Sequence, residues 1–317
     1  MSFDFPTLSD IKRAHQRIQK YLIPTPVLTS HNINDIANTE IYFKCENFQK
    51  TGSFKMRGAT NTILSVRPEE RENGFATHSS GNHAQAVAYA AHLAGSKAYI
   101  VMPNNAPKVK IEAVKAYGGE IVFCKPTEES RVKTCDEIIE KTGAIFIPPF
   151  DHPDIIAGQA TAAKEFIEEI TDLDILLTPV GGGGLAAGTT LATKYLLPGS
   201  QVILGEPEKA NDTYKAFKTG KIVPIKNPDT IADGLKVTVG ERNFAIIKEH
   251  VADIITVSEK EIVNAMRLIW ERVKIVIEPS CAVPFAAVLK KREIFENKKL
   301  GIILTGGNVD LGKLPFD

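Results

Sequence analysis

The chain has 317 residues, which fits one or two domains, and 43% of them are hydrophobic while 24% are charged. This composition is ordinary for a globular protein with a sizeable core. Lys plus Arg and Asp plus Glu each number 38, so the chain lacks the basic excess that binding to nucleic acid or an anionic membrane requires.

The first 22 residues, MSFDFPTLSDIKRAHQRIQKYL, lack the basic head, apolar run and cleavage site of a signal peptide. No apolar run approaches the roughly 18 residues that a membrane-spanning helix needs. The absence of CxxC spacing favours a reducing compartment over a disulfide framework or a structural zinc site. We therefore expect a cytoplasmic protein whose cysteines are free: Cys45, Cys124, Cys135 and Cys281.

The stretch QKTGSFKMRG (49–58) places Lys55 where a helix is predicted to begin. Ser53 is a candidate N-cap, and the residues after it carry a helical pattern that ends before Pro68. The partial positive charge of a helix N-terminus opposes an ammonium and lowers its pKa, so Lys55 is a candidate nucleophile. The alternative is a solvated lysine whose stem covers Phe54.

Short apolar runs alternate with amphipathic stretches from residue 75 onward, which predicts an α/β fold with a mostly parallel sheet covered on both faces. No linker, repeat or low-complexity segment divides the chain. The piece PPFDHPDIIAGQ (148–159) is the best candidate for a crossing between two sheets, because its prolines and Gly158 interrupt helix and strand patterns. The predicted strands lie in FATHSSG, AYIVMP, EIVFCK, DILLTPV, QVILGEPE and LGIILTGG.

HSSGNHAQ (78–85) is a strand-to-helix turn rich in small hydrogen-bond donors. Ser79, Ser80, Asn82 and the first N–H groups of the helix are suited to hold a carboxylate beside the positive end of the helix dipole. Ordinary capping explains one serine and not the whole group. For His83 alone, a structural role on an alanine-rich helix is the stronger interpretation.

VGGGGLAAG (180–188) follows an apolar strand and opens a helix. Four consecutive glycines contribute no packing, so they fit a turn whose N–H groups surround a phosphate; a merely tight turn needs fewer glycines. Gly181, Gly183 and Ala186 also match the dinucleotide fingerprint GxGxxA, with Glu206 near the place of its ribose-binding acid. A nicotinamide-dependent oxidoreductase therefore stays open as a rival.

LTGGNVD (304–310) is a third turn at the end of a strand. Thr305 can present a hydroxyl there, while Gly306 and Gly307 let the backbone approach a flat ring. A plain strand-ending turn would have the same composition.

Together these stretches resemble, over nearly the full chain, the fold type II pyridoxal 5'-phosphate enzymes, within them the serine racemase and serine/threonine ammonia-lyase (dehydratase) branch. The resemblance implies a two-domain, tryptophan synthase β-like α/β fold of mostly parallel twisted sheets covered by helices. It implies a large cofactor-binding domain (1–64 and 153–317) and a small domain (74–151). The motifs that carry it are KCENFQKTGSFKMRGA, THSSGNHAQA, VGGGGL, GEPEKAND, TIADG, IEPS and LTGGNVD.

For the cofactor, the resemblance implies that Lys55 forms the Schiff base, that Phe54 packs beside the ring and that Asn82 binds the ring hydroxyl. Thr305 matches the residue facing the pyridine nitrogen, where many relatives have Ser. A hydroxyl there cannot support protonation of that nitrogen as a carboxylate would, which favours elimination and proton exchange over transamination. The phosphate would lie among Gly181, Gly182, Gly183 and Gly184.

For the substrate, Ser79, Asn82 and His83 match the family loop that holds the carboxylate, and Ser80 matches the proton donor on the face opposite Lys55. Arg131, in TEESR, is a candidate partner for a distal carboxylate, as in 3-hydroxyaspartate; a helix-surface arginine is the alternative.

The resemblance to serine racemases further implies a divalent cation, Mg²⁺ or alternatively Ca²⁺ or Mn²⁺, at Glu206, the Ala210 carbonyl and Asp212. A solvated acidic loop is the alternative. The resemblance to serine racemases also implies a homodimer with a nucleotide site at its interface, where ATP would act as effector. The residues that match this site are Gln85, Tyr117 and Asn308.

The predicted enzyme is a serine racemase or L-serine/L-threonine ammonia-lyase that acts on β-hydroxy amino acids, by racemisation or by elimination of water to a keto acid and ammonia. The alternatives are a threo-3-hydroxyaspartate ammonia-lyase, the nicotinamide oxidoreductase, and a silent relative kept as a binding module, which Lys55 disfavours. The sequence leaves open the preferred substrate and the ratio of racemisation to elimination, because both outcomes share an intermediate.

Overall fold

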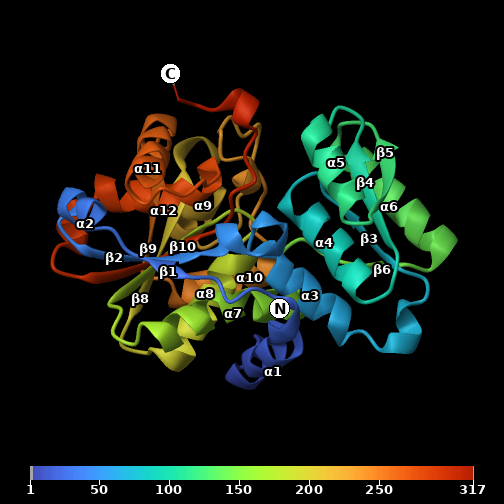
Figure 1. Cartoon of the computed structure of the whole chain (residues 1–317), viewed down its shortest axis with the longest axis horizontal. Coiled ribbons are helices and arrows are strands. Elements are labelled where there is room, and N and C mark those ends of the chain that lie inside the picture. Colours follow the sequence, from blue (N-terminus) through green and yellow to red (C-terminus); the bar gives the residue numbers. More distant parts are fainter. Residues whose placement is uncertain (1–2, 317) are drawn as a thin grey trace.

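The computed structural model describes residues 3–316, which form two sheets at the two sides of Figure 1. The larger sheet has the strand order β1-β2-β10-β7-β8-β9, and the smaller has the order β5-β4-β3-β6. β1 pairs antiparallel with β2, and the other pairings within the described residues are parallel. The strands are β1 (Val27–Leu28), β2 (Glu40–Cys45), β3 (Phe75–His78), β4 (Ala98–Pro103), β5 (Glu120–Cys124), β6 (Ile145–Phe146), β7 (Ile175–Pro179), β8 (Gln201–Pro207), β9 (Asp253–Val257) and β10 (Lys299–Leu304).

Helices cover both faces of the larger sheet, as buried parallel strands require. Because side chains alternate along a strand, Ile175 and Leu177 of β7 face one core while Leu176 faces the other. The first core is closed by α2 (His31–Ala37), α11 (Glu259–Arg272) and α12 (Pro279–Lys290). The second is closed by α1 (Leu8–Ile18), α7 (Pro153–Glu169), α8 (Gly184–Leu196) and α10 (Glu241–His250).

The smaller sheet has its own two cores. Phe75 and Ile100 pack on one face against helices α3, α4 and α5, and Ala76 and Val101 pack on the other against α6. The domain boundaries stay a prediction, although these strands all lie between Phe75 and Phe146. The helices are α3 (Lys55–Ser65), α4 (Asn82–Leu93), α5 (Lys108–Ala116) and α6 (Glu128–Thr142).

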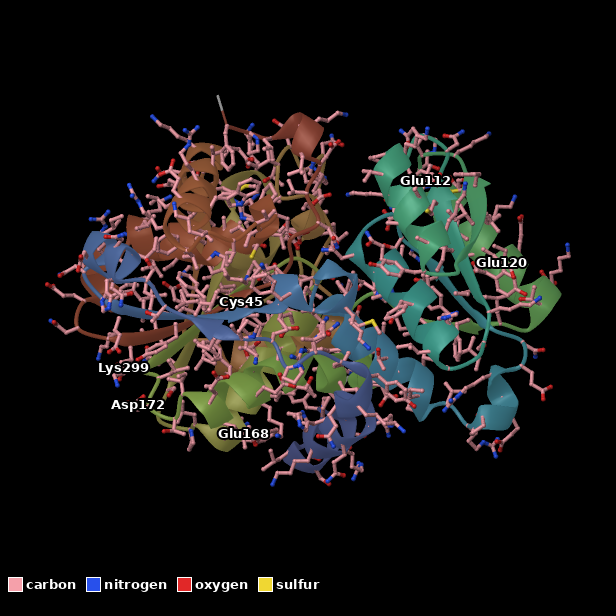
Figure 2. The ribbon with its side chains drawn as sticks, in the orientation of Figure 1. Cys45, Glu112, Glu120, Glu168, Asp172 and Lys299 are labelled. Atoms are coloured by element: carbon pink, nitrogen blue, oxygen red, sulfur yellow. The ribbon has the colours of Figure 1, made fainter. Side chains whose placement is uncertain are left out.

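Charged side chains lie mainly at the periphery, as Figure 2 shows for Glu112 and Glu120 beside the smaller sheet and for the ion pair of Lys299 and Asp172 at the edge of the larger. Cys45, by contrast, is fully buried in the first core. Between residues 3 and 316, no helix is both long and apolar enough to cross a membrane.

The chain crosses from the smaller sheet to the larger after β6, within the predicted segment. The prediction for Gly158 was wrong, because this residue lies inside α7 and only the residues before Pro153 are irregular. Gly158 serves helix packing instead: a Cβ on it would lie 2.6 Å from the Cα of Gly58 in α3. The crossing therefore leads directly into a helix that supports α3.

The turns singled out in the sequence follow β3, β7, β8 and β10 at their carboxyl ends. Parallel strands bring such ends to one edge of a sheet, where ligand sites of α/β folds lie. Four strands were not predicted from the sequence: β1, β2, β6 and β9.

Candidate active site

Lys55, the first residue of α3, lies where segments from both sheets meet. Its Nζ donates to the carbonyl of Pro149, 2.8 Å away, and lies 5.3 Å from the ring centroid of Phe54. The Phe54 N–H donates to the carbonyl of Thr305 after β10, at 3.0 Å. Ser53 does not cap the helix as predicted, because Phe54 occupies the N-cap position and the Ser53 hydroxyl has no partner in residues 3–316.

Burial lowers the pKa of Lys55 from its usual 10.5 to about 8, and the negative charge of Glu278 limits this shift. A sizeable fraction of the amine is therefore neutral near pH 8. An unprotonated amine is both a nucleophile and a base, whereas an ordinary solvated lysine is neither at this pH. Desolvation by the surrounding protein is the main cause of the lowered pKa.

The four glycines of the predicted loop are all buried: Gly181, Gly182 and Gly183 lie between β7 and α8, and Gly184 is the first residue of α8. Gly183 has φ +90, a left-handed conformation that side chains disfavour, and a Cβ on Gly182 would lie 2.2 Å from the ring of Phe150. Within the described residues, the N–H groups of Gly181, Gly182 and Gly183 donate to no protein acceptor. Together with the start of α8, these groups form a cradle suited to a phosphate.

Thr305 lies directly after β10 and is almost fully buried. Its backbone carbonyl holds the start of α3, but its hydroxyl has no hydrogen-bond partner in the described part of the chain. A buried hydroxyl without a partner is costly, so it is suited to bind a ligand atom.

Asn82, the first residue of α4, forms hydrogen bonds with two other side chains, Glu278 and Asn308. Its amide donates to both carboxylate oxygens of Glu278 at 3.0 and 3.1 Å, and its carbonyl accepts from Asn308 at 2.9 Å. Burial raises the pKa of Glu278 to about 7, and the charge of Asp233 adds to the effect. Sequence reasoning missed Glu278, although the IEPS motif contains it, because nothing local to the motif indicates that this acid is buried beside Asn82.

His83, at the start of α4, lies close enough to Lys55 for the charge of the amine to act on its ring. His83 is buried, and its Nε2 lies 3.1 Å from the carbonyl of Ile147. Burial, together with the positive charge of Lys55, lowers the pKa of His83 to about 3, so this ring is neutral at physiological pH. Ser79 and Ser80 are half-buried, and the Ser79 hydroxyl accepts from the N–H of Gly81 at 3.3 Å.

Arg131 lies near the start of α6, beside His78 at the end of β3. Burial, and next the charge of Arg131, lower the pKa of His78, whose ring stacks on Phe146 at 5.5 Å. In residues 3–316 the half-buried Arg131 guanidinium has no ion pair or hydrogen bond. It is thus available to an anion.

The residues matched to a nucleotide site are only partly brought together. Asn308 contacts Asn82 directly and also donates to the carbonyl of Thr51, 2.8 Å away. Gln85 is buried on α4, and Tyr117 packs against Tyr89 of the same helix with 5.3 Å between the ring centroids.

Glu206 and Asp212 form a second acidic site, at the end of β8. Glu206 caps α9 (Asp212–Thr219) by accepting from the N–H groups of Thr213 and Tyr214 at 3.0 and 2.8 Å. Asp212 accepts from Val239 through one oxygen, while its buried Oδ1 has no partner in residues 3–316. Burial raises the pKa of Glu206 to about 8 and that of Asp212 to about 6.

This acidic pair fits a hard cation, because it offers two close carboxylates and one oxygen without a donor. Within the described chain, however, no three His, Cys, Asp or Glu side chains gather as metal ligands. A cation here would need backbone carbonyls and water, and the Ala210 carbonyl lies in the right segment, η5 (Glu208–Ala210).

A sequence model of the family described as pyridoxal-phosphate dependent enzyme matches residues 18–306. The chain belongs to this family. It is 46% identical to a β-hydroxyaspartate dehydratase of Paracoccus denitrificans, over 98% of this chain and 99% of the relative. It is 50% identical to a serine racemase of Dictyostelium discoideum, over 97% of this chain and 96% of the relative.

Solved structures agree with this assignment. Maize serine racemase superimposes with a TM-score of 0.95 at 40% identity, over 98% of this chain and 95% of that chain. The fold of a pyridoxal-phosphate dependent enzyme, with parallel sheets covered by helices, is therefore confirmed. Membership in the family also removes the reason to assign GxGxxA to a dinucleotide.

The site fits pyridoxal phosphate on its own geometry. The glycine cradle suits the phosphate, the partnerless hydroxyl of Thr305 suits the ring nitrogen, and the amine of Lys55 suits the aldehyde. Each of these groups follows the carboxyl end of a strand of the larger sheet or lies in hydrogen-bond contact with such a segment.

Proposed function

We propose that this enzyme acts on β-hydroxy amino acids, by racemisation and by elimination of water to a keto acid and ammonia. The observation that carries the proposal is the buried amine of Lys55, whose pKa lies near 8, next to an anion cradle and a turn of small donors. The proposal agrees with the names of the relatives, a serine racemase and a hydroxyaspartate dehydratase.

Pyridoxal phosphate, when bound, supplies an electron sink for the charge that develops at the substrate Cα. We expect Lys55 to attach it, Phe54 to pack beside the ring, Asn82 to bind the ring hydroxyl and Thr305 to meet the pyridine nitrogen. The phosphate would be held by Gly181, Gly182, Gly183 and Gly184.

Lys55 would remove the α-proton from one face of the substrate. Its amine is suited to this because burial keeps a large fraction unprotonated at pH 8, and because the Pro149 carbonyl orients Nζ. Ser80 would return a proton to the other face, which inverts the amino acid. If the β-hydroxyl instead leaves as water before that proton is returned, the released enamine is hydrolysed to the keto acid and ammonia.

The substrate carboxylate would lie at the N-terminus of α4, against Ser79 and Asn82. For His83, support is weaker, since its Nε2 already faces the Ile147 carbonyl. With Nε2–H donating to that carbonyl, the neutral ring leaves Nδ1 as an acceptor, so Nδ1, which has no partner in residues 3–316, would meet a proton donor and not the carboxylate.

One observation favours hydroxyaspartate as a substrate over serine or threonine. The guanidinium of Arg131 is half-buried near the same turn and has no partner in the described chain, and an arginine suits bidentate binding of a second carboxylate. The P. denitrificans relative carries the corresponding name.

We also propose a divalent cation, Mg²⁺ in the first place, at Glu206, the Ala210 carbonyl and Asp212. The raised pKa values of the two acids support this, because their ionised forms lack a compensating charge. A homodimer with ATP as effector near Gln85, Tyr117 and Asn308 rests on the resemblance to serine racemases. A cytoplasmic location is supported by four free, buried cysteines.

The test compares Ser80→Ala with the parent enzyme on L-serine, D-serine, L-threonine and threo-3-hydroxyaspartate, scoring keto-acid release and chirality with and without Mg²⁺. We expect racemisation and the reaction of D-serine to fall by about 100-fold, the usual scale of general acid–base catalysis, while elimination from L-substrates persists. Equal loss of all activities would contradict the role of Ser80.

Lys55→Ala serves as the reference variant in the same assays and should lose every activity. Borohydride treatment of the parent enzyme followed by peptide mapping should find the cofactor on Lys55. Full activity of Lys55→Ala, or a colourless protein that binds NADH, would overturn the proposed function.

A further inference from the structure

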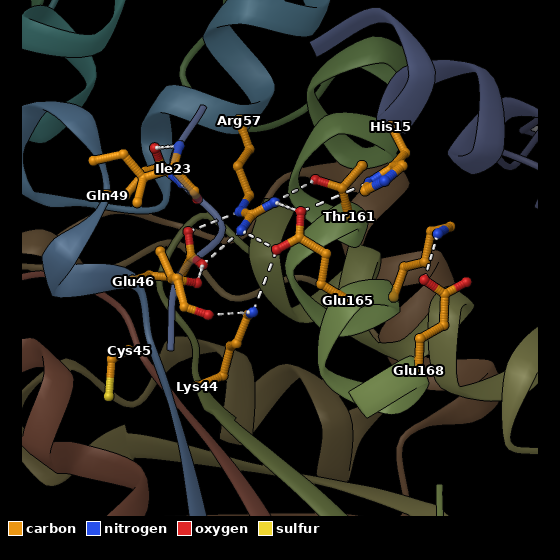
Figure 3. A network of polar contacts seen from close by, with 12 residues as sticks. His15, Ile23, Lys44, Cys45, Glu46, Gln49, Arg57, Thr161, Glu165 and Glu168 are labelled. Atoms are coloured by element: carbon orange, nitrogen blue, oxygen red, sulfur yellow. Dashed lines mark hydrogen bonds and ion pairs between the residues drawn. The ribbon is translucent and has the colours of Figure 1, made fainter. Parts of the chain in front are cut away.

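Arg57, two residues after Lys55, is fully buried and has a partner for every N–H of its guanidinium (Figure 3). Nε and Nη2 donate to the two oxygens of Glu46 at 2.7 and 2.8 Å. Nη1 and Nη2 donate to the two oxygens of Glu165 at 2.8 and 2.7 Å, and Nη1 also donates to Thr161 at 3.1 Å. The guanidinium thus joins three segments: the end of β2, the start of α3 and the middle of α7.

The two carboxylates are held in turn by other groups. Thr25 donates to Glu46 at 2.6 Å, and the buried Lys44 lies 3.3 Å from Glu165 and donates to the Thr25 carbonyl. Two cations therefore face two anions, and the charge is balanced. We call this set the Arg57 cluster: Lys44, Glu46, Arg57, Thr161 and Glu165.

The Arg57 cluster contributes little to the free energy of unfolding. The cost of removing its charged groups from water offsets most of the attraction between them. What such a network provides is geometry. An arginine bound bidentately by two carboxylates has one orientation, whereas apolar side chains of similar volume can slide and repack.

The start of α3 needs such geometry. Its N-cap residue, Phe54, makes no side-chain capping bond. Where α3 crosses α7, Gly58 meets Gly158 backbone to backbone, so side chains do not interlock there, and the Gly58 N–H donates to Gln159 at 3.1 Å. The Arg57 cluster lies at the same crossing, where Arg57 of α3 donates to Glu165 of α7.

The segment that leads into α7 also carries the acceptor of the catalytic amine. The carbonyl of Pro149 binds Lys55 Nζ, and Phe150 packs against Gly182 of the glycine cradle. A shift of α3 along α7 would therefore move the amine relative to its acceptor and to the cradle.

We infer that the Arg57 cluster positions Lys55 for the reaction by locking α3 in register on α7. This inference rests on the proposed function of Lys55 but concerns residues that do not touch the substrate. Arg57 and Glu165 are positioning residues, and their loss should alter the geometry of the amine more than substrate binding.

The experiment compares Arg57→Lys and Glu165→Gln with the parent enzyme. A lysine cannot bind two carboxylates bidentately, and glutamine keeps the shape of Glu165 without its charge. Arg17→Lys is the matched control, since Arg17 also donates to α3, at Asn61, but lies outside the cluster. We expect kcat to fall about 10- to 100-fold in the two cluster variants with KM within about threefold, the scale of a misplaced catalytic group.

A second readout does not depend on turnover. The pH midpoint for acetylation of Lys55, followed by peptide mass spectrometry in the full chain freed of cofactor, should rise from about 8 toward 10.5 in the cluster variants. It should stay unchanged in Arg17→Lys. If the parent enzyme proves inactive on hydroxy amino acids, the proposed function fails, yet this midpoint still tests the positioning role.

An unchanged kcat and an unchanged midpoint in Arg57→Lys, even with a lower Tm, would show a purely structural role and overturn the inference. Should Arg57→Lys fail to fold, Glu165→Gln decides by the same two readouts. That variant leaves the pair of Arg57 with Glu46 intact, and Glu165 is 19% exposed, so it is the milder change.

Discussion

Lys55 and His83 show at the residue scale how burial selects protonation states. Both are cations in their ordinary protonated form, and both lose the proton more easily because the protein around them replaces water. For Lys55 the result is an amine that titrates near pH 8. For His83 the result is a ring that stays neutral. The nearby charge of Lys55 lowers the pKa of this ring further.

His83 leads to a prediction for acid stability. Its pKa is about 3 in the folded chain against an ordinary 6.5, so the unfolded chain binds more protons between these values. Stability therefore rises with pH through this window and is lost as pH falls, by about 1.4 kcal/mol per pH unit below pH 6.5 from this group. Denaturant unfolding of the parent and of His83→Asn from pH 7.5 to 4.5 should show a shallower decline in the variant. Parallel curves would rule out His83 as the cause.

Glu278 shows the limit of predicting contacts from individual residues. The acid belongs to the IEPS motif, but its partner Asn82 is 196 positions away. Nothing in the local composition indicates that these side chains meet, or that burial raises the pKa of the acid to about 7. Arg57 was missed for the same reason, since Glu165 lies 108 positions further along.

At the element scale, the turns after strands were the most predictable part of the site. The glycine loop, the turn after β3 and the turn after β10 were all placed correctly, because glycine, serine and asparagine concentrate where a strand gives way to a helix or loop. Ser53 and Gly158 were misjudged. Capping depends on the backbone angle at Phe54, and a glycine inside a helix can serve close packing as well as a break.

The glycine loop leads to a prediction for the variant Gly182→Ala. The new Cβ would lie 2.2 Å from the Phe150 ring, so the loop or the ring must move. We expect the cofactor Kd to rise at least about tenfold and unfolding to become easier by about 1–3 kcal/mol, the usual cost of overpacking. Fluorescence titration and denaturant unfolding measure the two effects.

Gly199→Ala is the matched control for that loop, because its Cβ would meet no atom within 4 Å. It should leave the affinity for pyridoxal phosphate unchanged. If Gly182→Ala binds the cofactor as tightly as the control, the loop is not the phosphate cradle.

At the scale of the whole molecule, the two sheets are joined by α3, α7 and a few contacts across the site. One is the ion pair of Lys110 in α5 with Asp233 in η6 (Asp233–Leu235), with 2.5 Å between Nζ and Oδ2. Both side chains are partly exposed, so the pair contributes less than about 1 kcal/mol to stability. Because the ion pair connects α5, beside the smaller sheet, with η6, beside the larger, we expect its loss to change the orientation of the two sheets relative to each other.

We therefore expect Lys110→Ala to change Tm by less than about 3 °C, as befits an exposed pair, while kcat/KM falls about three- to tenfold at low salt. High salt should reduce the difference from the parent enzyme, because it screens the pair. Lys108→Ala, at an exposed position of the same helix, is the control. Equal kinetics in both variants would show that the pair does not affect the site.

The alternation of strands and helices from residue 75 onward, the sequence of ligand-like turns and the enzyme family could be inferred from residues close together in the chain, whereas strands β1, β2, β6 and β9 were not predicted. Strand, turn and cap preferences are local properties, so short stretches carry them. The protonation of Lys55 and His83, the place of Glu278 and the Arg57 cluster emerged only in the folded chain. Desolvation and ion pairing depend on what packs around a group, and many of those neighbours are distant in the chain: Pro149 lies 94 positions from Lys55, and Asn82 lies 196 positions from Glu278.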